Sequence, residues 1–276
     1  MAISSSDEDI DLTLIEHRAR SVAHLFVDRV ARTPAAEAFR FPRGETWESV
    51  TWAQADDRVR QMAAGLVALG IESEQRVALA SSTRYEWVLA DLAVMLAGAA
   101  TTTIYPTTFE SDVTYIARDS QSRIVFAEDN AQIAKFRASR SELADVVKVV
   151  TFDGTPDGDW VISLTDLEQL GVAHLAKVPS VVDDRIAAIE PQHLATLIYT
   201  SGTTGRPKGV RLSHDAWTYE AAAIDAIHIL SPEDLQYLWL PLAHVFGESW
   251  DANRKSDRLS GYPREFAGDA SCCAKR

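Results

Sequence analysis

The feature that most constrains this chain is an alternation, beginning near residue 50, of helical patterns with short β-branched runs. The predicted helices, from apolar residues at helical spacing, cover 51–69, 84–97, 109–118 and 130–139. The predicted strands cover 76–80, 100–105, 123–127 and 146–152. Strands that alternate with helices pair in parallel, because each helix carries the chain back along the sheet. The sequence therefore predicts an α/β fold with a parallel sheet and crossover helices.

Local signals set several boundaries within this pattern. Thr51 and Gln54 are spaced as a capping box at the start of the first helix, and Gly70 is expected to end it. Asp153–Gly158 is rich in turn residues and is predicted to be an internal boundary of the chain. Residues 181–193 carry mixed charges without strong periodicity, and Leu194–Tyr199 is a further apolar run predicted to be a strand.

Composition excludes several classes of protein. The 276 residues are 46% hydrophobic, which excludes a disordered chain, and the net charge of −13 disfavours nonspecific nucleic-acid binding. Cys272 and Cys273 cannot form a disulfide framework or a four-ligand zinc site, and the histidines show no metal-ligand spacing. Met1–Ile10 lacks the basic and apolar regions of a secretory signal, and polar residues interrupt Trp87–Ile104, the longest apolar stretch. We therefore expect a cytoplasmic protein without a transmembrane segment or a metal cluster.

The segment Thr200–Gly209 (TSGTTGRPKG) carries the clearest chemical signal. Its glycines permit positive φ and let backbone N–H groups approach an anion closely, and its hydroxyl groups add further donors. Lys208 supplies a positive charge, and Pro207 stiffens the loop. These properties predict a site for a polyphosphate. The segment is not a standard P-loop, because Pro207 precedes the lysine where that motif has glycine. A flexible linker rich in glycine and serine is the alternative interpretation.

The ordered pattern at Tyr199–Val210 resembles the phosphate-binding motif of the adenylate-forming (AMP-binding) superfamily, which includes acyl-CoA synthetases, peptide-synthetase adenylation domains and luciferases. Leu240–Gly247 (LPLAHVFG) resembles the next motif of that superfamily. The stretch from Thr51 to Gly247 is similar to bacterial long-chain fatty acyl-CoA synthetases, and includes Ser82–Trp87 and Thr101–Thr108. The resemblance implies that residues 1–247 form the N-terminal part of the superfamily's large domain, with an incomplete parallel sheet.

The resemblance also implies a two-step reaction with ATP, Mg²⁺, coenzyme A and a long-chain fatty acid. The carboxylate attacks the α-phosphate of ATP, and the thiol of coenzyme A then displaces AMP from the acyl-adenylate. His244 corresponds to a residue at the junction of the acyl and nucleotide sites, although a buried structural histidine is the alternative on chemistry alone. The phosphate-binding residues by this resemblance are Thr200, Ser201, Gly202, Thr203, Thr204, Gly205 and Lys208.

Other polar clusters are assigned no role. Arg84, Tyr85 and Trp87 are explained by a capped amphipathic helix, and the acidic run Asp7–Asp11 is explained by a solvated surface.

The resemblance stops after Gly247. The superfamily's later motifs, including the C-terminal lysine that contacts the reacting carboxylate, do not occur in the sequence, so no catalytic residue is assigned. Residues 248–276 lack strand and helix periodicity, and from 251 they hold six basic residues against four acidic ones. We expect this tail to be disordered and unrelated or out of frame, and the chain to be a truncated or frameshifted family member.

Three functional interpretations remain open from the sequence. The first is a long-chain fatty acid–CoA ligase by family, inactive as this fragment. The second is a noncatalytic ATP-binding fragment, which the missing lysine favours. The third is an adenylate-forming enzyme for another carboxylic acid. A peripheral membrane contact for fatty-acid delivery is compatible with the first.

Overall fold

The computed structural model describes residues 11–200, 205–228, 238 and 241–243. The helices are α1 (Leu12–Glu16), α2 (Val22–Arg32), α3 (Trp52–Ala68), α4 (Tyr85–Leu96), α5 (Glu110–Asp119), α6 (Asn130–Ala138), the 3₁₀ turn η2 (Arg140–Glu142), α7 (Leu164–Leu175), α8 (Val181–Ala187) and α9 (His214–Ala226). The strands are β1 (Glu37–Arg43), β2 (Thr46–Thr51), β3 (Arg76–Ala80), β4 (Ala100–Ile104), β5 (Ser122–Ala127), β6 (Lys148–Thr151), β7 (Val161–Ser163), β8 (Leu194–Thr200) and β9 (Lys208–Ser213).

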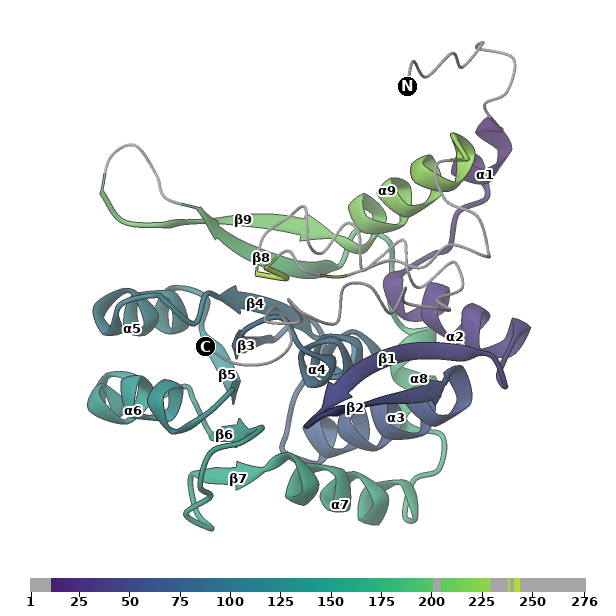
Figure 1. The fold of residues 1–276 in the computed structure, drawn as a ribbon. Coiled ribbons are helices and arrows are strands. Elements are labelled where there is room, and N and C mark those ends of the chain that lie inside the picture. The colour runs from purple at the N-terminus through teal and green to yellow at the C-terminus, as the bar shows by residue number, and fades with distance from the viewer. Residues whose placement is uncertain (1–10, 201–204, 229–237, 239–240, 244–276) are drawn as a thin grey trace.

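The described strands form a seven-stranded sheet, with the order β7-β6-β5-β3-β4-β8-β9, and a separate antiparallel hairpin, β1-β2 (Figure 1). From β7 to β8 each neighbouring pair is parallel, which confirms the predicted parallel sheet with crossover helices. Among the described strands of this sheet, only β9 runs antiparallel to its neighbour, and it forms a hairpin with β8. The hairpin forms one edge of the sheet and runs past helix α5 (Figure 1).

Helices cover both faces of the sheet, so its central strands are buried on both sides. Val77 and Leu79 of β3 pack into one apolar cluster, together with α3, α4 and α7. Ala78 and Ala80 of the same strand pack into a second cluster, together with α5 and α6. Successive side chains of a strand point to opposite faces, so two-sided burial requires a continuous apolar run rather than an alternating one. This explains why the predicted strands are visible in the sequence as short runs without regular polar alternation.

Helix α4 is the central helix on its face of the sheet, and its character differs from the prediction. Every residue of α4 except Glu86 is buried, so the helix is apolar on all sides rather than amphipathic. The side chain of Arg84 makes no cap hydrogen bond to it, and instead forms ion pairs with Glu86 and Asp153. The amphipathic, capped helix assumed for Arg84, Tyr85 and Trp87 is therefore wrong.

The internal boundary predicted at Asp153–Gly158 is also wrong. Strand β7 follows this loop and pairs in parallel with β6, from Val149↔Val161 to Thr151↔Ser163, so the sheet continues across it. The capping box at Thr51 and Gln54 is confirmed by reciprocal hydrogen bonds of 3.2 and 2.8 Å. No helix of the described residues is long and apolar enough to cross a bilayer.

Helices α3 and α7 cross at two glycines. A Cβ atom added to Gly171 would lie 1.7 Å from the backbone oxygen of Gln61 and 2.9 Å from the nitrogen of Gly65. A Cβ atom on Gly65 would lie 2.3 Å from the backbone oxygen of Leu167. Because both obstacles are backbone atoms, neither can move aside by changing a rotamer. The close approach of these helices therefore depends on the absence of both side chains.

We predict that Gly171→Ala destabilises the protein by about 1–3 kcal/mol, because overpacking forces the helices apart. Ordinary helix propensity acts in the opposite direction and would favour alanine by up to about 1 kcal/mol. Urea denaturation measures the change. Val172→Ala is the matched control, because Val172 lies on the same helix and is 51% exposed. A Gly171→Ala variant as stable as that control would contradict the packing argument.

Candidate functional site

The described residues of the predicted phosphate-binding segment, Thr200 and 205–209, lie at the end of the β8-β9 hairpin. The antiparallel register pairs Tyr199 with Gly209 and Thr200 with Lys208 at the mouth of the turn. Thr200 and Lys208 are both exposed. This pairing brings a hydroxyl group and an ammonium group, eight positions apart in the sequence, to the two sides of one loop. The arrangement is suited to an anion, which needs several donors converging from different directions.

Glycine occurs at two positions of this segment for different structural reasons. Gly205 has φ of +117°, a conformation that L side chains rarely adopt, as the sequence predicted for a close backbone approach. Gly209 does not have a positive φ. A Cβ atom there would lie 3.1 Å from the ring of Tyr199, so this glycine makes room for the cross-strand tyrosine. The positive φ that the sequence suggested for Gly209 is therefore not found, and packing against Tyr199 gives this glycine a structural reason.

We call the residues that enter the turn, Tyr199 and Thr200, its outgoing leg, and those that leave it, 205–208, its returning leg. The outgoing leg is attached to helix α5. The hydroxyl of Tyr199 donates a hydrogen bond of 2.7 Å to Oδ2 of Asp119, and its ring meets the ring of Tyr115 edge to face at 6.4 Å. Partial burial, followed by the hydrogen bond to the Asp119 carboxylate, raises the pKa of Tyr199 above its ordinary value. The phenol therefore remains a neutral donor at physiological pH.

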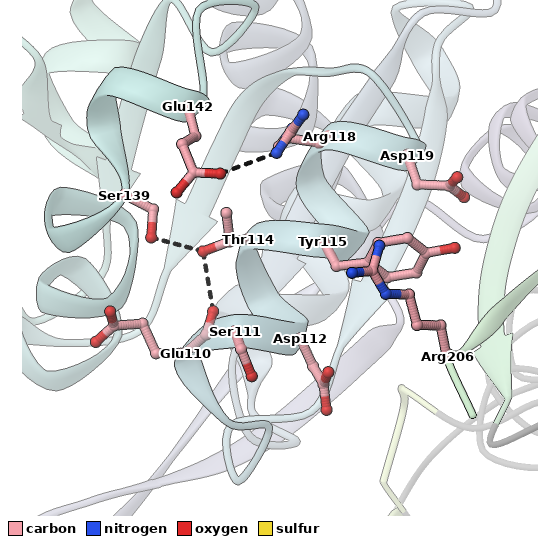
Figure 2. Close-up of a pocket in the computed structure, with 10 residues that line it drawn as sticks. All are labelled: Glu110, Ser111, Asp112, Thr114, Tyr115, Arg118, Asp119, Ser139, Glu142 and Arg206. Carbon is pink, nitrogen blue, oxygen red and sulfur yellow. Dashed lines mark hydrogen bonds and ion pairs between the residues drawn. The ribbon is translucent and has the colours of Figure 1, made fainter.

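The returning leg is attached to the same helix by Arg206. Its guanidinium lies over the ring of Tyr115, 5.2 Å from the ring centroid, within the range of a cation–π contact. Figure 2 shows Arg206 reaching from the hairpin to α5 across a groove of about 760 Å³. The lining of this groove is Glu110, Ser111, Asp112, Thr114, Tyr115, Arg118, Asp119, Ser139, Glu142 and Arg206.

A second segment of interest lies at the carboxyl ends of β3 and β4. The backbone N–H of Leu242 donates to Oγ1 of Thr83 at 3.0 Å, and Oγ1 of Thr103 donates to the carbonyl oxygen of Ala243 at 3.2 Å. Leu242 and Ala243 are both buried. The chain that directly precedes His244 is therefore fixed against the sheet, at the edge where α/β proteins bind their ligands.

The structure describes three of the eight residues predicted for the site. Thr200 ends β8, Gly205 lies in the turn, and Lys208 begins β9. The residues predicted from sequence that lie outside the described residues are Ser201, Gly202, Thr203, Thr204 and His244. Sequence reasoning missed Tyr115 and Asp119, which lie 84 and 80 positions before Tyr199 and have no local motif. The described residues contain no group of three or more His, Cys, Asp or Glu arranged for a metal ion.

The sequence pattern that defines the AMP-binding enzymes matches residues 26–253, which is most of the chain and includes both segments described above. The chain belongs to the AMP-binding enzyme family. This result confirms the resemblance drawn from Tyr199–Val210 and Leu240–Gly247, and it makes an incidental linker an inadequate explanation of the hairpin turn.

Curated members of the family show related sequences over part of their length. The long-chain-fatty-acid–CoA ligase FadD15 of Mycobacterium bovis is 34% identical over 208 residues, which cover 74% of this chain and 33% of that protein. The long-chain-fatty-acid–CoA ligase ACSBG2 of Rattus norvegicus is 30% identical over 239 residues, which cover 84% and 35%. The chain thus spans about a third of the length of the curated relatives it matches.

Solved structures agree with the fold. The anthranilate CoA ligase AuaEII, in complex with anthranoyl-AMP, superposes with a TM-score of 0.74 at 19% identity, over 97% of this chain and 49% of that one. The fatty acyl-adenylate ligase from L. pneumophila, in complex with acyl adenylate and pyrophosphate, gives a TM-score of 0.67 at 22% identity, over 94% and 42%. The described α/β unit is therefore the N-terminal part of the fold of adenylate-forming enzymes.

We predict that Thr103→Val destabilises the protein by about 1–2 kcal/mol, because the buried carbonyl of Ala243 loses its donor. Thr102→Val is the matched control. Its hydroxyl is buried on the same strand, and it finds no hydrogen-bond partner among the residues that the structure describes. Valine at 102 should therefore be neutral or slightly stabilising. The free energy of unfolding, measured in urea, compares the two variants, and equal effects would show that the contact with Ala243 contributes nothing.

Proposed function

We propose that this chain carries the phosphate-binding part of a long-chain fatty acid–CoA ligase of the AMP-forming type. The observation that supports the proposal best is the β8-β9 turn, where Thr200 and Lys208 face each other across a loop rich in glycine and hydroxyl groups. The names of the curated relatives support the fatty acid as the class of substrate. Each of these ligases is about three times longer than the matched part of this chain.

In the proposed reaction, a carboxylate oxygen of the fatty acid attacks the α-phosphorus of ATP, and pyrophosphate leaves. The sulfur of coenzyme A then attacks the acyl carbon, and AMP leaves. Backbone N–H groups and hydroxyls of Thr200–Gly205, with the ammonium of Lys208, hold the β- and γ-phosphates. Their contribution is to position the leaving group and to stabilise the charge that develops on it. His244 is proposed to lie where the acyl and nucleotide sites meet.

Mg²⁺ enters the proposal as the ion that accompanies ATP. The described residues do not offer an acidic cluster for it, so they do not fit a resident metal site, and no step is assigned to the ion. The chain as a whole carries a net charge of −13 and would repel phosphates. The positive charge that attracts them must therefore be local, and in this proposal it is the ammonium of Lys208.

Two other functions are compatible with the same loop. A noncatalytic ATP-binding fragment would bind the nucleotide through Thr200 and Lys208 without transferring it. An adenylate-forming enzyme for another acid is supported by the fold neighbour that bears anthranoyl-AMP. Slow residual exchange of pyrophosphate into ATP that depends on a fatty acid would support the ligase, and residual exchange that depends on an aryl acid would support the other enzyme. No exchange above background with either acid would support the noncatalytic fragment.

We predict that Lys208→Ala weakens ATP binding by roughly 10- to 100-fold, because a hydrogen bond to a charged group contributes about 1.5–3 kcal/mol. Isothermal titration calorimetry with MgATP measures the dissociation constant. Lys177→Ala is the control, because Lys177 is an exposed lysine after the end of α7, far from the hairpin in the sequence. Equal affinities for the wild type and Lys208→Ala would contradict the proposed role of the loop.

We also predict that the 276-residue chain binds ATP weakly and does not complete turnover. The family's C-terminal lysine and its adenine and ribose motifs do not occur in this sequence. ATP–pyrophosphate exchange in the presence of a long-chain fatty acid should therefore be far slower than for a full-length relative assayed in parallel. An exchange rate near that of the relative would disprove this prediction.

A further inference from the structure

The β8-β9 turn receives little lateral support from the sheet. The parallel pairing between β4 and β8 ends at Thr103↔Ile198, whereas the pairing between β8 and β9 continues to Thr200↔Lys208. The last residues of β8, Tyr199 and Thr200, therefore lie beyond the part of β8 that pairs with β4. Figure 1 shows the hairpin projecting from the body of the molecule on the side of α5. An isolated two-stranded hairpin is only marginally stable in water, so its position depends on side-chain contacts.

Those contacts come from one face of helix α5, and they reach both legs of the turn. On the outgoing leg, Tyr199 donates to the Asp119 carboxylate at 2.7 Å and packs edge to face on Tyr115. On the returning leg, Arg206 lies over the same Tyr115 ring at 5.2 Å. Tyr115 thus contacts both legs, and Asp119, four residues later on α5, contacts one of them.

The residues on either side of Arg206 restrict the backbone of the returning leg. Gly205, directly before Arg206, adopts φ of +117°. Pro207, directly after Arg206, has its φ restricted by its ring. A Cβ atom at Gly209 would lie 3.1 Å from the Tyr199 ring, so the missing side chain lets the ring lie close against the opposite strand. The tyrosine can therefore reach α5 without pushing β9 away. Figure 2 shows the Arg206 side chain alongside the Tyr115 ring, with Asp119 beyond it.

We propose that Tyr115 and Asp119 of α5 are positioning residues for the phosphate loop, holding its two legs at the separation that ATP requires. They act through Tyr199 and Arg206, and they do not touch the nucleotide. We call the contacts of Tyr115 and Asp119 with Tyr199 and Arg206 the clamp. Its effect on ATP affinity rests on the proposed function, whereas its contacts involve only described residues. The proposal also implies that the Arg206 guanidinium contacts the Tyr115 ring and does not bind a phosphate group.

A neighbouring charge on α5, Arg118, has a partner away from the turn. Arg118 pairs with Glu142 at 2.9 Å, on the side of α5 away from the hairpin (Figure 2). This ion pair is exposed at both ends, so its removal should change stability little. Arg118→Gln is therefore a matched control, since it alters charge beside Asp119 without touching either leg of the turn.

The first experiment measures the clamp without any ligand. Hydrogen–deuterium exchange of the peptide that spans 199–210 is compared among the wild type, Tyr115→Leu and Tyr115→Phe. Loss of an exposed cation–π contact should raise exchange of this peptide by about two- to fivefold in Tyr115→Leu. Tyr115→Phe keeps the ring and should behave as the wild type. Arg118→Gln should also leave the exchange of this peptide unchanged.

The second experiment measures the consequence for ATP. Calorimetry with MgATP should show an affinity about two- to fivefold weaker for Tyr115→Leu, and unchanged for Tyr115→Phe and Arg118→Gln. Asp119→Ala should weaken ATP binding similarly, whereas Asp119→Asn keeps an acceptor for Tyr199 and should retain most of the affinity. Asp119 is exposed, so this second pair tests the clamp even where Tyr115→Leu does not fold.

The results of the two experiments distinguish failure of the clamp, of its positioning role and of the proposed function. Unchanged exchange of the 199–210 peptide in Tyr115→Leu and Asp119→Ala would overturn the clamp. Faster exchange with unchanged ATP affinity would overturn the positioning role, since the legs would then move without consequence for the nucleotide. A wild-type chain that does not bind ATP would overturn the proposed function, and the exchange measurement alone would then decide whether α5 holds the turn.

Discussion

The parallel pairing of β8 with β4 is the contact on which the rest of the site depends. It joins the hairpin that carries the phosphate loop to the buried sheet, through Thr101↔Thr196 to Thr103↔Ile198. Trp217 of α9 reinforces β8 by donating from Nε1 to the buried hydroxyl of Thr196 at 3.0 Å. Because the pairing stops at Ile198, the sheet holds the base of the hairpin and leaves the turn to be held by α5.

The sheet also organises the second segment. Thr103 of β4 and Thr83, just after β3, hold the backbone at Leu242 and Ala243, and β4 also pairs with β8, the strand that leads into the phosphate loop. In a parallel sheet all carboxyl ends lie along one edge, and residues far apart in the sequence converge there. This convergence brings the end of β8 and the region preceding His244 to the same edge of the sheet.

The buried strands and helices could be predicted because two-sided burial leaves a strong local pattern. Strand β3 occurs where it was predicted, over Arg76–Ala80, and α3 begins at the predicted capping box. Strand β9 was not predicted, since its first four residues are exposed and include Lys208 and Arg211, so it has no apolar run. The boundary at Asp153–Gly158 was wrong because turn residues mark a tight connection as readily as a domain border, and only the pairing of β6 with β7 distinguishes them.

By itself the sequence determined the α/β class, the family and the chemical character of the turn from Thr200 to Lys208, because these properties reside in contiguous residues. Only the tertiary structure decided that the motif lies on an antiparallel hairpin, that Gly209 is small to accommodate Tyr199, and that Tyr115 of α5 lies under both legs of the turn. The physical reason is distance along the chain. A contact between residues 80 or more positions apart leaves no periodicity or spacing in the sequence, and exists only once the sheet has brought β8 beside β4 and α5 beside the hairpin.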